Sequence, residues 1–213
     1  MGMAQRSDRQ RAVKDLKRAL ILDAARKVFE REGLEGASLR AIAAAAGYTP
    51  AALYFHFDSK EAIYAEMLRG SLANLAAAVD AATARAKTPS DQLRAAAMAF
   101  FRYYADNPRD LDLGFYLFRG GMKRQGLGKT HDAALNTALL AALAPIATAA
   151  EALGARHDAA NVLRAEIFAH AAGLLLLAHT GRLSLFDTSA LQLMQRFVAD
   201  KIAALRAKPK KPS

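Results

Sequence analysis

The chain contains no cysteine, so it can form neither disulfide bonds nor a thiolate metal site, and this composition fits a reducing compartment. No hydrophobic run is long enough to cross a membrane, because the most apolar stretch covers only residues 171–178. The polar, basic N-terminus lacks the apolar segment of a secretory signal. We therefore expect a soluble cytoplasmic protein without membrane contacts.

Motifs of catalysis and cofactor binding are also missing. Neither G-x-S-x-G nor H-E-x-x-H occurs, and the glycine-rich segment 120–128 lacks the residue order of a phosphate-binding loop. Glu166 and His170 are one helical turn apart, but no further ligand completes a metal set and His179 is out of phase with both. The sequence predicts no enzymatic activity, no catalytic residues, no cofactor and no metal.

Acidic side chains are too few to balance the basic ones, since 30 Lys and Arg against 20 Asp and Glu give a formal net charge of +10. Basic residues crowd residues 1–18, which we expect to be a flexible arm, and they recur in a Pro/Lys tail at 207–213 that we expect to be disordered. The arm either lies along DNA phosphates or remains a solvated end, and both interpretations stay open.

A segment beginning at Ser38 predicts two short helices joined by a tight turn. Ser38 is placed to cap a helix whose apolar residues recur from Leu39 at i, i+3, i+4 and i+7. Gly47 follows the last of these residues, where a left-handed backbone favours glycine. Thr49 and Pro50 then supply a cap and a first helical residue for the second helix. This pattern is typical of a helix-turn-helix that reads DNA.

The second helix is expected to end near Phe57 and to present its leading turn to base edges in the major groove. Leu53 is expected to face inward. Further along, Tyr54 and His56 carry groups that can donate to phosphate, and Lys60 lies at the start of a third helix opened by a predicted capping box.

Residues 36–63, which read GASLRAIAAAAGYTPAALYFHFDSKEAI, resemble the N-terminal domain of TetR-type transcriptional regulators. The resemblance extends back to Ile21 and fades beyond about Met67. It implies an all-helical ligand-binding and dimerisation domain after the DNA-reading module. It also implies DNA contacts by Arg40, Thr49, Pro50, Ala51, Ala52, Tyr54, His56 and Lys60, to which Ser38 and Tyr48 are added as candidates. Base specificity is left open between Thr49, Arg40 and Tyr48.

The rest of the chain reads as helix, so the predicted fold class is all-α with the helix-turn-helix domain at 19–65 and an effector-binding and dimerisation domain at 66–206. Helix breaks are expected at Ser90, which could cap the next helix, and at Pro145.

The last two helices, about 158–180 and 188–206, carry a wide apolar stripe that predicts an intermolecular four-helix bundle in a homodimer. A purely intramolecular core is the alternative. The predicted dimer residues are Leu174, Leu177, Leu191, Met194, Val198 and Ile202.

Aromatic residues in the middle of the chain predict a pocket for a hydrophobic or aromatic effector. Its candidate wall and polar handles are Phe100, Tyr103, Tyr104, Phe115, Phe118, Met122, His131 and His170. Together these patterns predict a ligand-responsive, sequence-specific regulator at the nucleoid, a repressor released from a double-stranded, pseudo-palindromic operator. The alternative is an architectural DNA-binding protein that uses positive charge without reading sequence.

Overall fold

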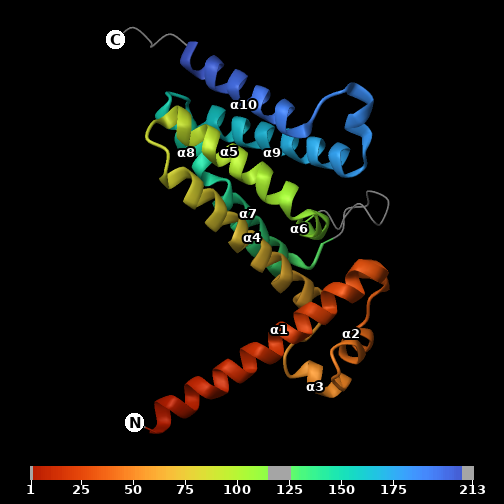
Figure 1. Cartoon of the computed structure of the whole chain (residues 1–213). Helices are drawn as coiled ribbons and strands as arrows, with labels where there is room; N and C mark the ends of the chain where they lie inside the picture. Colours follow the sequence, from red (N-terminus) through yellow and green to blue (C-terminus); the bar gives the residue numbers. More distant parts are fainter. Residues whose placement is uncertain (1, 115–125, 208–213) are drawn as a thin grey trace. The chain divides into compact units, whose positions relative to one another are not determined.

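The computed structural model describes residues 2–114 and 126–207, and side chains from residue 8 onward within those ranges. The described residues form α-helices and one 3₁₀ helix, and contain no strand. The helices are α1 (Gly2–Gly36), α2 (Leu39–Ala45), α3 (Pro50–Tyr54), α4 (Lys60–Ala84), α5 (Pro89–Asp106), α6 (Pro108–Gly114), α7 (Lys129–Ala142), α8 (Ala144–Ala152), α9 (His157–His179), η2 (Arg182–Phe186) and α10 (Ala190–Ala207) (Figure 1). The all-α prediction is confirmed.

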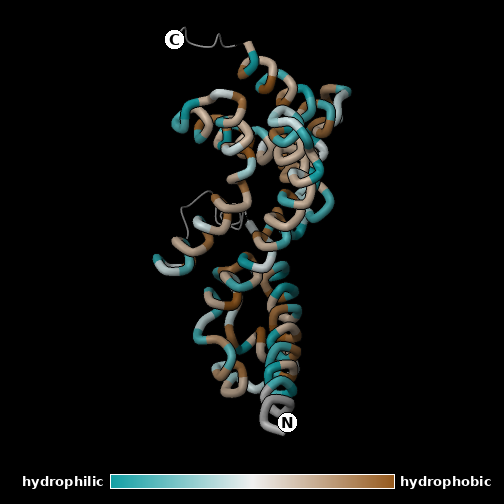
Figure 2. Tube along the Cα trace, turned by 90° about the vertical axis from the view of Figure 1, so that its left-hand side faces the viewer, coloured by the Kyte–Doolittle hydropathy of each residue, from teal (hydrophilic) through white to brown (hydrophobic). Residues whose placement is uncertain are grey.

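The helices belong to two compact units. The first unit contains Met1–Gly70 together with Leu113–Leu135, and the second contains Ser71–Asp112 together with Asn136–Ser213. Teal and brown residues alternate along the helices in Figure 2, as expected of helices that bury one face.

The first unit is a helical domain in which α2 packs against both α1 and α3. Ile21, Ala25 and Val28 on α1 are almost completely buried, as are Ile42 on α2 and Ile63 on α4. These residues form the core that holds α2 and α3 in place.

The second unit is a helical layer arrangement in which α5 packs on α8 and α9, and α9 packs on α8 and α10 (Figure 1). Its core contains Phe100, Ile146, Ile167, Leu175 and Met194, each of which is at most 2% exposed. By length and composition alone α9 could cross a membrane, but one face of it, with Leu163, Ile167 and Leu175, is buried against these neighbouring helices.

Several predicted boundaries need correction. Residues 2–18, expected to be a flexible arm, are helical and continue into the rest of α1. The helix after the first break is capped by Thr88 instead of Ser90, because the Thr88 side chain accepts from the Asp91 N–H. Pro145 does separate two helices, and the pair α7 and α8 is bent by 41° at the break. The predicted tail at 207–213 lies outside the described residues apart from Ala207.

The wide apolar stripe on the last two helices has an intramolecular explanation. Leu174, Met194, Val198 and Ile202 are each at most 6% exposed, so they face the core of their own chain. This corrects their assignment to a dimer interface. Leu177 is half-buried and Leu191 is exposed, so only these two of the six predicted residues have surface to offer a partner.

Candidate nucleic-acid interface

The two short helices are held by the caps that the sequence predicts. The Ser38 hydroxyl accepts from the Ala41 N–H at 3.1 Å and opens α2. Gly47 in the turn has φ of 72°, a conformation that favours glycine. The Thr49 hydroxyl accepts from the Ala52 N–H at 3.2 Å, and Pro50 is the first residue of α3. Local signals therefore fix the start of both helices.

One face of α3 anchors the helix and the other faces solvent. Leu53 is fully buried, as predicted, and Phe57 just beyond α3 is 3% exposed. The outward side presents five exposed residues, three at the start of the helix and two at its end. They are Thr49, Pro50, Ala51, Tyr54 and Phe55. The second helix is shorter than predicted, since α3 ends at Tyr54.

Phe55 is a surface residue that the sequence interpretation missed. It is 88% exposed beside Tyr54, which is 57% exposed. An aromatic ring this exposed gains little from folding, because it buries almost no area. Its place next to Tyr54 makes it a candidate contact to nucleic acid. The sequence gives only a weak indication that Phe55 is exposed, because an aromatic residue close to the buried Leu53 could equally well belong to the core.

Arg18 fixes the end of the reading segment, although the sequence placed it in the arm. Its guanidinium donates to both carboxylate oxygens of Glu66 on α4, with the Nε–Oε1 distance at 2.6 Å. It also donates to the His56 carbonyl at 2.9 Å and lies 4.2 Å from the centre of the Phe57 ring. The hydrogen bond to Glu66 raises the pKa of Arg18 further, so this clamp carries a permanent charge.

Lys60 has a different role from a free phosphate contact. Its ammonium group donates to the Glu35 and Ala37 carbonyls, each at 3.0 Å, where the chain leaves α1. Two of its three donors are therefore used inside the unit, which leaves one for a phosphate. The predicted capping box is wrong in detail: the Ser59 hydroxyl accepts from the Ala62 N–H, so Ala62, and not Glu61, occupies the position that a capping box gives to an acidic residue.

The remaining candidates divide by exposure. Arg40 on α2 is exposed. Tyr48, Ala52 and His56 are half-buried, and the rings of Tyr48 and His56 meet edge to face with centroids 6.4 Å apart. The Nδ1 atom of His56 is buried without a hydrogen-bond partner. His56 is thus held partly inward, and contact of its ring with DNA remains a prediction.

Basic residues continue along α1. Its N-terminal part carries exposed basic side chains on a helix, where a flexible arm was expected. They are Arg9, Arg11, Lys14 and Lys17. Such a charged helix can attract phosphate groups.

The predicted effector residues are divided between the second unit, the first unit and residues outside the described ranges. Phe100 and Tyr104 are buried with ring centroids 5.3 Å apart, and Phe168 lies 5.8 Å from Phe100. Neither of the two cavities described in the second unit is lined by these rings. Phe115, Phe118 and Met122 lie outside the described residues. His131 belongs to the first unit, and its place relative to these rings is not defined.

Tyr103 is engaged by its own unit. Its hydroxyl oxygen lies 2.6 Å from the Asp110 carboxylate and 3.1 Å from the Ser71 carbonyl. Burial and the hydrogen bond to Asp110 raise the pKa of Tyr103 to about 12, so the hydroxyl stays protonated and donates. Its role as a polar handle for a ligand would require breaking these contacts.

His170 connects α9 to α10. Its ring stacks on Phe197 with centroids 3.9 Å apart, and its Nε2 atom is buried without a partner. No group of three metal-ligating side chains exists within the described ranges 2–114 and 126–207. His170 therefore contributes to packing between two helices of the second unit.

The N-terminal segment has recognisable relatives. Residues 21–67 match the sequence model described as bacterial regulatory proteins, tetR family. The HTH-type transcriptional repressor KstR2 of Rhodococcus jostii is 46% identical over 59 residues, which is 28% of this chain and 29% of that protein. The HTH-type transcriptional activator FasR of Mycolicibacterium smegmatis is 36% identical over 93 residues, 44% of this chain and 42% of that protein. The chain thus matches less than half the length of these curated relatives.

Solved structures share the fold over most of the chain. A TetR family transcription regulator from Marinobacter aquaeolei has a TM-score of 0.65 at 19% identity, covering 90% of this chain and 97% of that one. A bacterial regulatory protein in the tetR family from Rhodococcus has a TM-score of 0.63 at 21% identity, covering 89% and 96%. With its capped helix-turn-helix, the matched segment 21–67 is similar to the tetR family of bacterial regulatory proteins, and the solved structures share the fold over most of the chain.

Proposed function

We propose that this chain is a sequence-specific, DNA-binding transcriptional regulator whose α3 enters the major groove by its N-terminal end. The observation that carries the proposal is the exposed start of α3, where Thr49, Pro50 and Ala51 face solvent while Leu53 anchors the helix. Small side chains let the helix approach base edges closely, and the Ala51 methyl group can contact a thymine methyl. TetR-family proteins are regulators and not enzymes, which agrees with the missing catalytic motifs.

A homodimer is part of the proposal because a five-residue helix reads few bases. Two copies related by a two-fold axis read a pseudo-palindrome with half-sites about 34–36 Å apart, or a multiple of that distance. Each copy would supply α3 to one half-site, in the cytoplasm and at the nucleoid.

An effector would act through linkage between the two units. A ligand that binds one arrangement of the dimer better than another shifts the population toward that arrangement. The ligand then changes the affinity for DNA by the same factor by which DNA changes the affinity for the ligand. We propose a small effector with a hydrophobic or aromatic body. We propose repression as the outcome, because a protein that occupies a promoter blocks polymerase without any further contact, whereas activation needs a polymerase-binding surface.

A measured preference for one DNA sequence distinguishes the proposed regulator from the alternative, an architectural DNA-binding protein. The full chain would be used to enrich duplexes from a random library, and its dissociation constants for an enriched and a scrambled duplex would be compared at one fixed salt concentration. A regulator should prefer the enriched duplex by about 4 kcal/mol or more. Equal affinities with a steep salt dependence would show an architectural protein and refute the proposal.

Thr49 offers a test at one base position. Thr49→Ala should weaken binding to the enriched duplex by about 1–3 kcal/mol, mostly at one base pair, and it should also destabilise the first unit by about 1 kcal/mol because the cap on Ala52 is lost. Thr49→Ser keeps the capping hydroxyl and serves as the control. If Thr49→Ala weakens scrambled and enriched duplexes equally, Thr49 does not read a base.

A further inference from the structure

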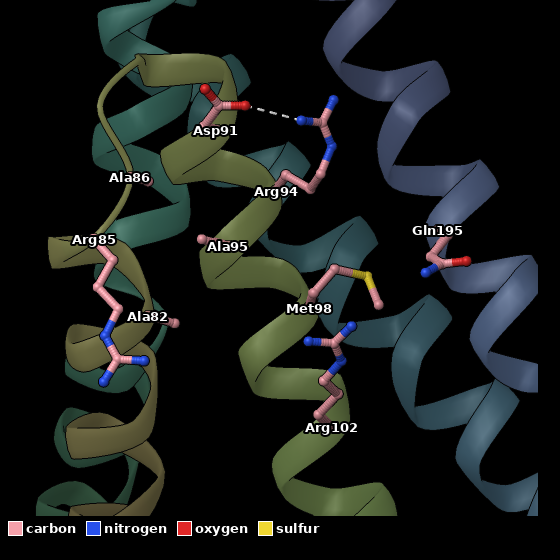
Figure 3. A pocket seen from close by; sticks show the side chains of 9 residues that line it. All are labelled: Ala82, Arg85, Ala86, Asp91, Arg94, Ala95, Met98, Arg102 and Gln195. Atoms are coloured by element: carbon pink, nitrogen blue, oxygen red, sulfur yellow. Dashed lines mark hydrogen bonds and ion pairs between the residues drawn. The ribbon is translucent and has the colours of Figure 1, made fainter.

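A cleft of about 570 Å³ opens on the second unit, away from the buried aromatic rings. Figure 3 shows that its walls come from the end of α4, the loop that follows it, α5 and α10. Its volume lies within the range of small-molecule sites, about 300–1,000 Å³. Nothing in the DNA-reading function requires such a cleft.

Three arginines give the cleft an excess of positive charge. Arg85, just after the end of α4, and Arg94 and Arg102 on α5 line it, against a single carboxylate, that of Asp91. Arg94 donates from one terminal nitrogen to Asp91 at 3.0 Å and retains its other donors. Arg85 and Arg102 have no ion-pair or hydrogen-bond partner among the described residues. The cleft therefore holds two uncompensated guanidinium groups.

The rest of the lining is largely apolar. Ala82 from α4, Ala86 from the loop that follows it, and Ala95 and Met98 from α5 form the surface between the arginines. Met98 is only 6% exposed, so its side chain lies at the base of the cleft, and a methionine adapts to ligands of irregular shape. Gln195 on α10 adds an amide that can donate to an oxygen of a bound group.

This combination selects among ligand classes. An inorganic anion would use the arginines and gain nothing from the alanines and Met98. A DNA phosphate would likewise leave the apolar base unused. A planar carboxylate matches the fork of a guanidinium group, and an attached apolar body covers the alanine and methionine surface.

We propose that this cleft binds an organic carboxylate with an apolar body, its carboxylate held by Arg85 and Arg102 and its body against Ala95 and Met98. Its identification as the effector site rests on the proposed regulatory function, whereas the binding itself does not. Binding is therefore tested without DNA, and DNA affinity without ligand, so that the two proposals fail separately.

The test titrates the full chain by calorimetry with octanoate, acetate and 1-octanol at equal ionic strength. Octanoate should bind measurably, whereas acetate lacks the apolar body and 1-octanol lacks the charge, so each should bind at least about tenfold more weakly. Equal heats for octanoate and 1-octanol, or for octanoate and acetate, would overturn the proposal.

Variants then locate the site. The double substitution Arg85→Gln with Arg102→Gln should weaken octanoate binding by at least about tenfold, because both side chains are exposed and their loss leaves the fold intact. Ala82→Leu, which adds bulk to the cleft without changing its charge, should also weaken octanoate binding. The matched control is Arg182→Gln, an exposed arginine of the same unit outside the cleft. Wild-type octanoate affinity in the double variant refutes the site.

A DNA-binding role for the same arginines is an outcome of the test. If the double variant keeps its octanoate affinity and loses affinity for a scrambled duplex, the cleft is part of a nucleic-acid surface and the carboxylate proposal is wrong. If it loses octanoate and keeps the duplex, the proposal stands.

Discussion

Arg18 is one side chain that positions three segments of the first unit. It joins α1 to Glu66 on α4 and to the backbone of His56, and it covers the ring of Phe57. Its spacing places it on the same face of α1 as Ile21, Ala25 and Val28, but its acceptors lie 38 and 48 residues away. Helical periodicity could have predicted that Arg18 lies on the buried face of α1. No local sequence pattern could have predicted that Glu66 and the His56 carbonyl are its partners.

We predict that Arg18→Gln lowers the free energy of unfolding by about 1–3 kcal/mol, because Glu66 and the His56 carbonyl lose a charged donor in a partly buried place. Urea unfolding followed by circular dichroism measures this change. The control is Arg31→Gln, whose partner Glu32 is its neighbour in sequence, and which should change stability by less than about 0.5 kcal/mol. An equal effect of both variants would show that Arg18 is not a clamp.

His170 gives the second unit a pH dependence. Burial lowers the pKa of His170, and the charge of Lys201 lowers it further, while a backbone hydrogen bond to Leu193 opposes the shift. Lys201 also lies 5.1 Å from the centre of the Phe197 ring and pairs with Glu166 at 2.6 Å. The native state therefore favours the neutral imidazole.

We predict that stability falls as the pH decreases from about 6.5 toward the lowered pKa of His170. In that window the unfolded chain takes up the proton before the native chain does, so unfolding is favoured. Thermal unfolding measured between pH 7.5 and 5.5 should show this fall in the wild type and a smaller one in His170→Gln. Identical slopes in the two proteins would contradict the assignment.

At the scale of elements, local signals predicted where helices begin better than where they end. Ser38 and Thr49 cap α2 and α3 as expected, because a hydroxyl and the third following N–H interact within a single turn. The end of α3 depends on neighbouring segments, and residues 2–18 are helical because they continue α1. No single sequence motif encodes either feature. The predicted cap Ser90 lies inside α5, because Pro89 is the first helical residue and Thr88 before it accepts the capping hydrogen bond.

Gly47 provides the sharpest test of the turn between α2 and α3. A Cβ at this position would meet nothing within 4 Å, so a substitution would suffer only from the left-handed backbone, with φ of 72°. Gly47→Ala should therefore destabilise the first unit by about 1–2 kcal/mol. It should also weaken operator binding, because the turn sets the angle of α3.

The control for this variant is Gly70→Ala. Gly70 lies inside α4, where an added Cβ also meets nothing within 4 Å, and alanine is the better helix former. We expect it to stabilise the chain by up to about 1 kcal/mol in the same melting experiment. Effects of equal sign would mean that the turn does not require a left-handed residue.

At the scale of the whole molecule, the sequence predicted the fold class and the reading module but not the residues available to a partner. Amphipathic periodicity cannot distinguish a stripe that meets the chain's own core from one that meets a second copy, and Met194 and Val198 prove to be core. Several exposed apolar residues of the second unit lie near the end of α9, in η2 and at the start of α10. They are Leu176, Leu185, Phe186 and Leu191.

We predict that these residues contribute to the proposed homodimer. Leu185 and Phe186 are 79% and 70% exposed, so replacing both by Asp leaves the core intact while opposing burial against a partner. Sedimentation equilibrium should show a dimer for the wild type and a monomer for the double variant at micromolar concentration. Operator affinity should fall by at least about tenfold.

Leu140→Asp is the matched control, since Leu140 is 50% exposed on α7, away from these segments. It should leave the dimer unchanged. A wild type that is monomeric, or a double variant that still dimerises, would remove these residues from the interface.

The brevity of α3 has a consequence for any attempt to isolate its activity. A helix of five residues is far below the length at which a peptide stays folded in water, about 12–15 residues even for favourable sequences. A synthetic fragment covering residues 49–57 would therefore be unstructured and would not discriminate between duplexes. Recognition of DNA is in this sense a collective property: the shape of the probe is supplied by the helices packed behind it.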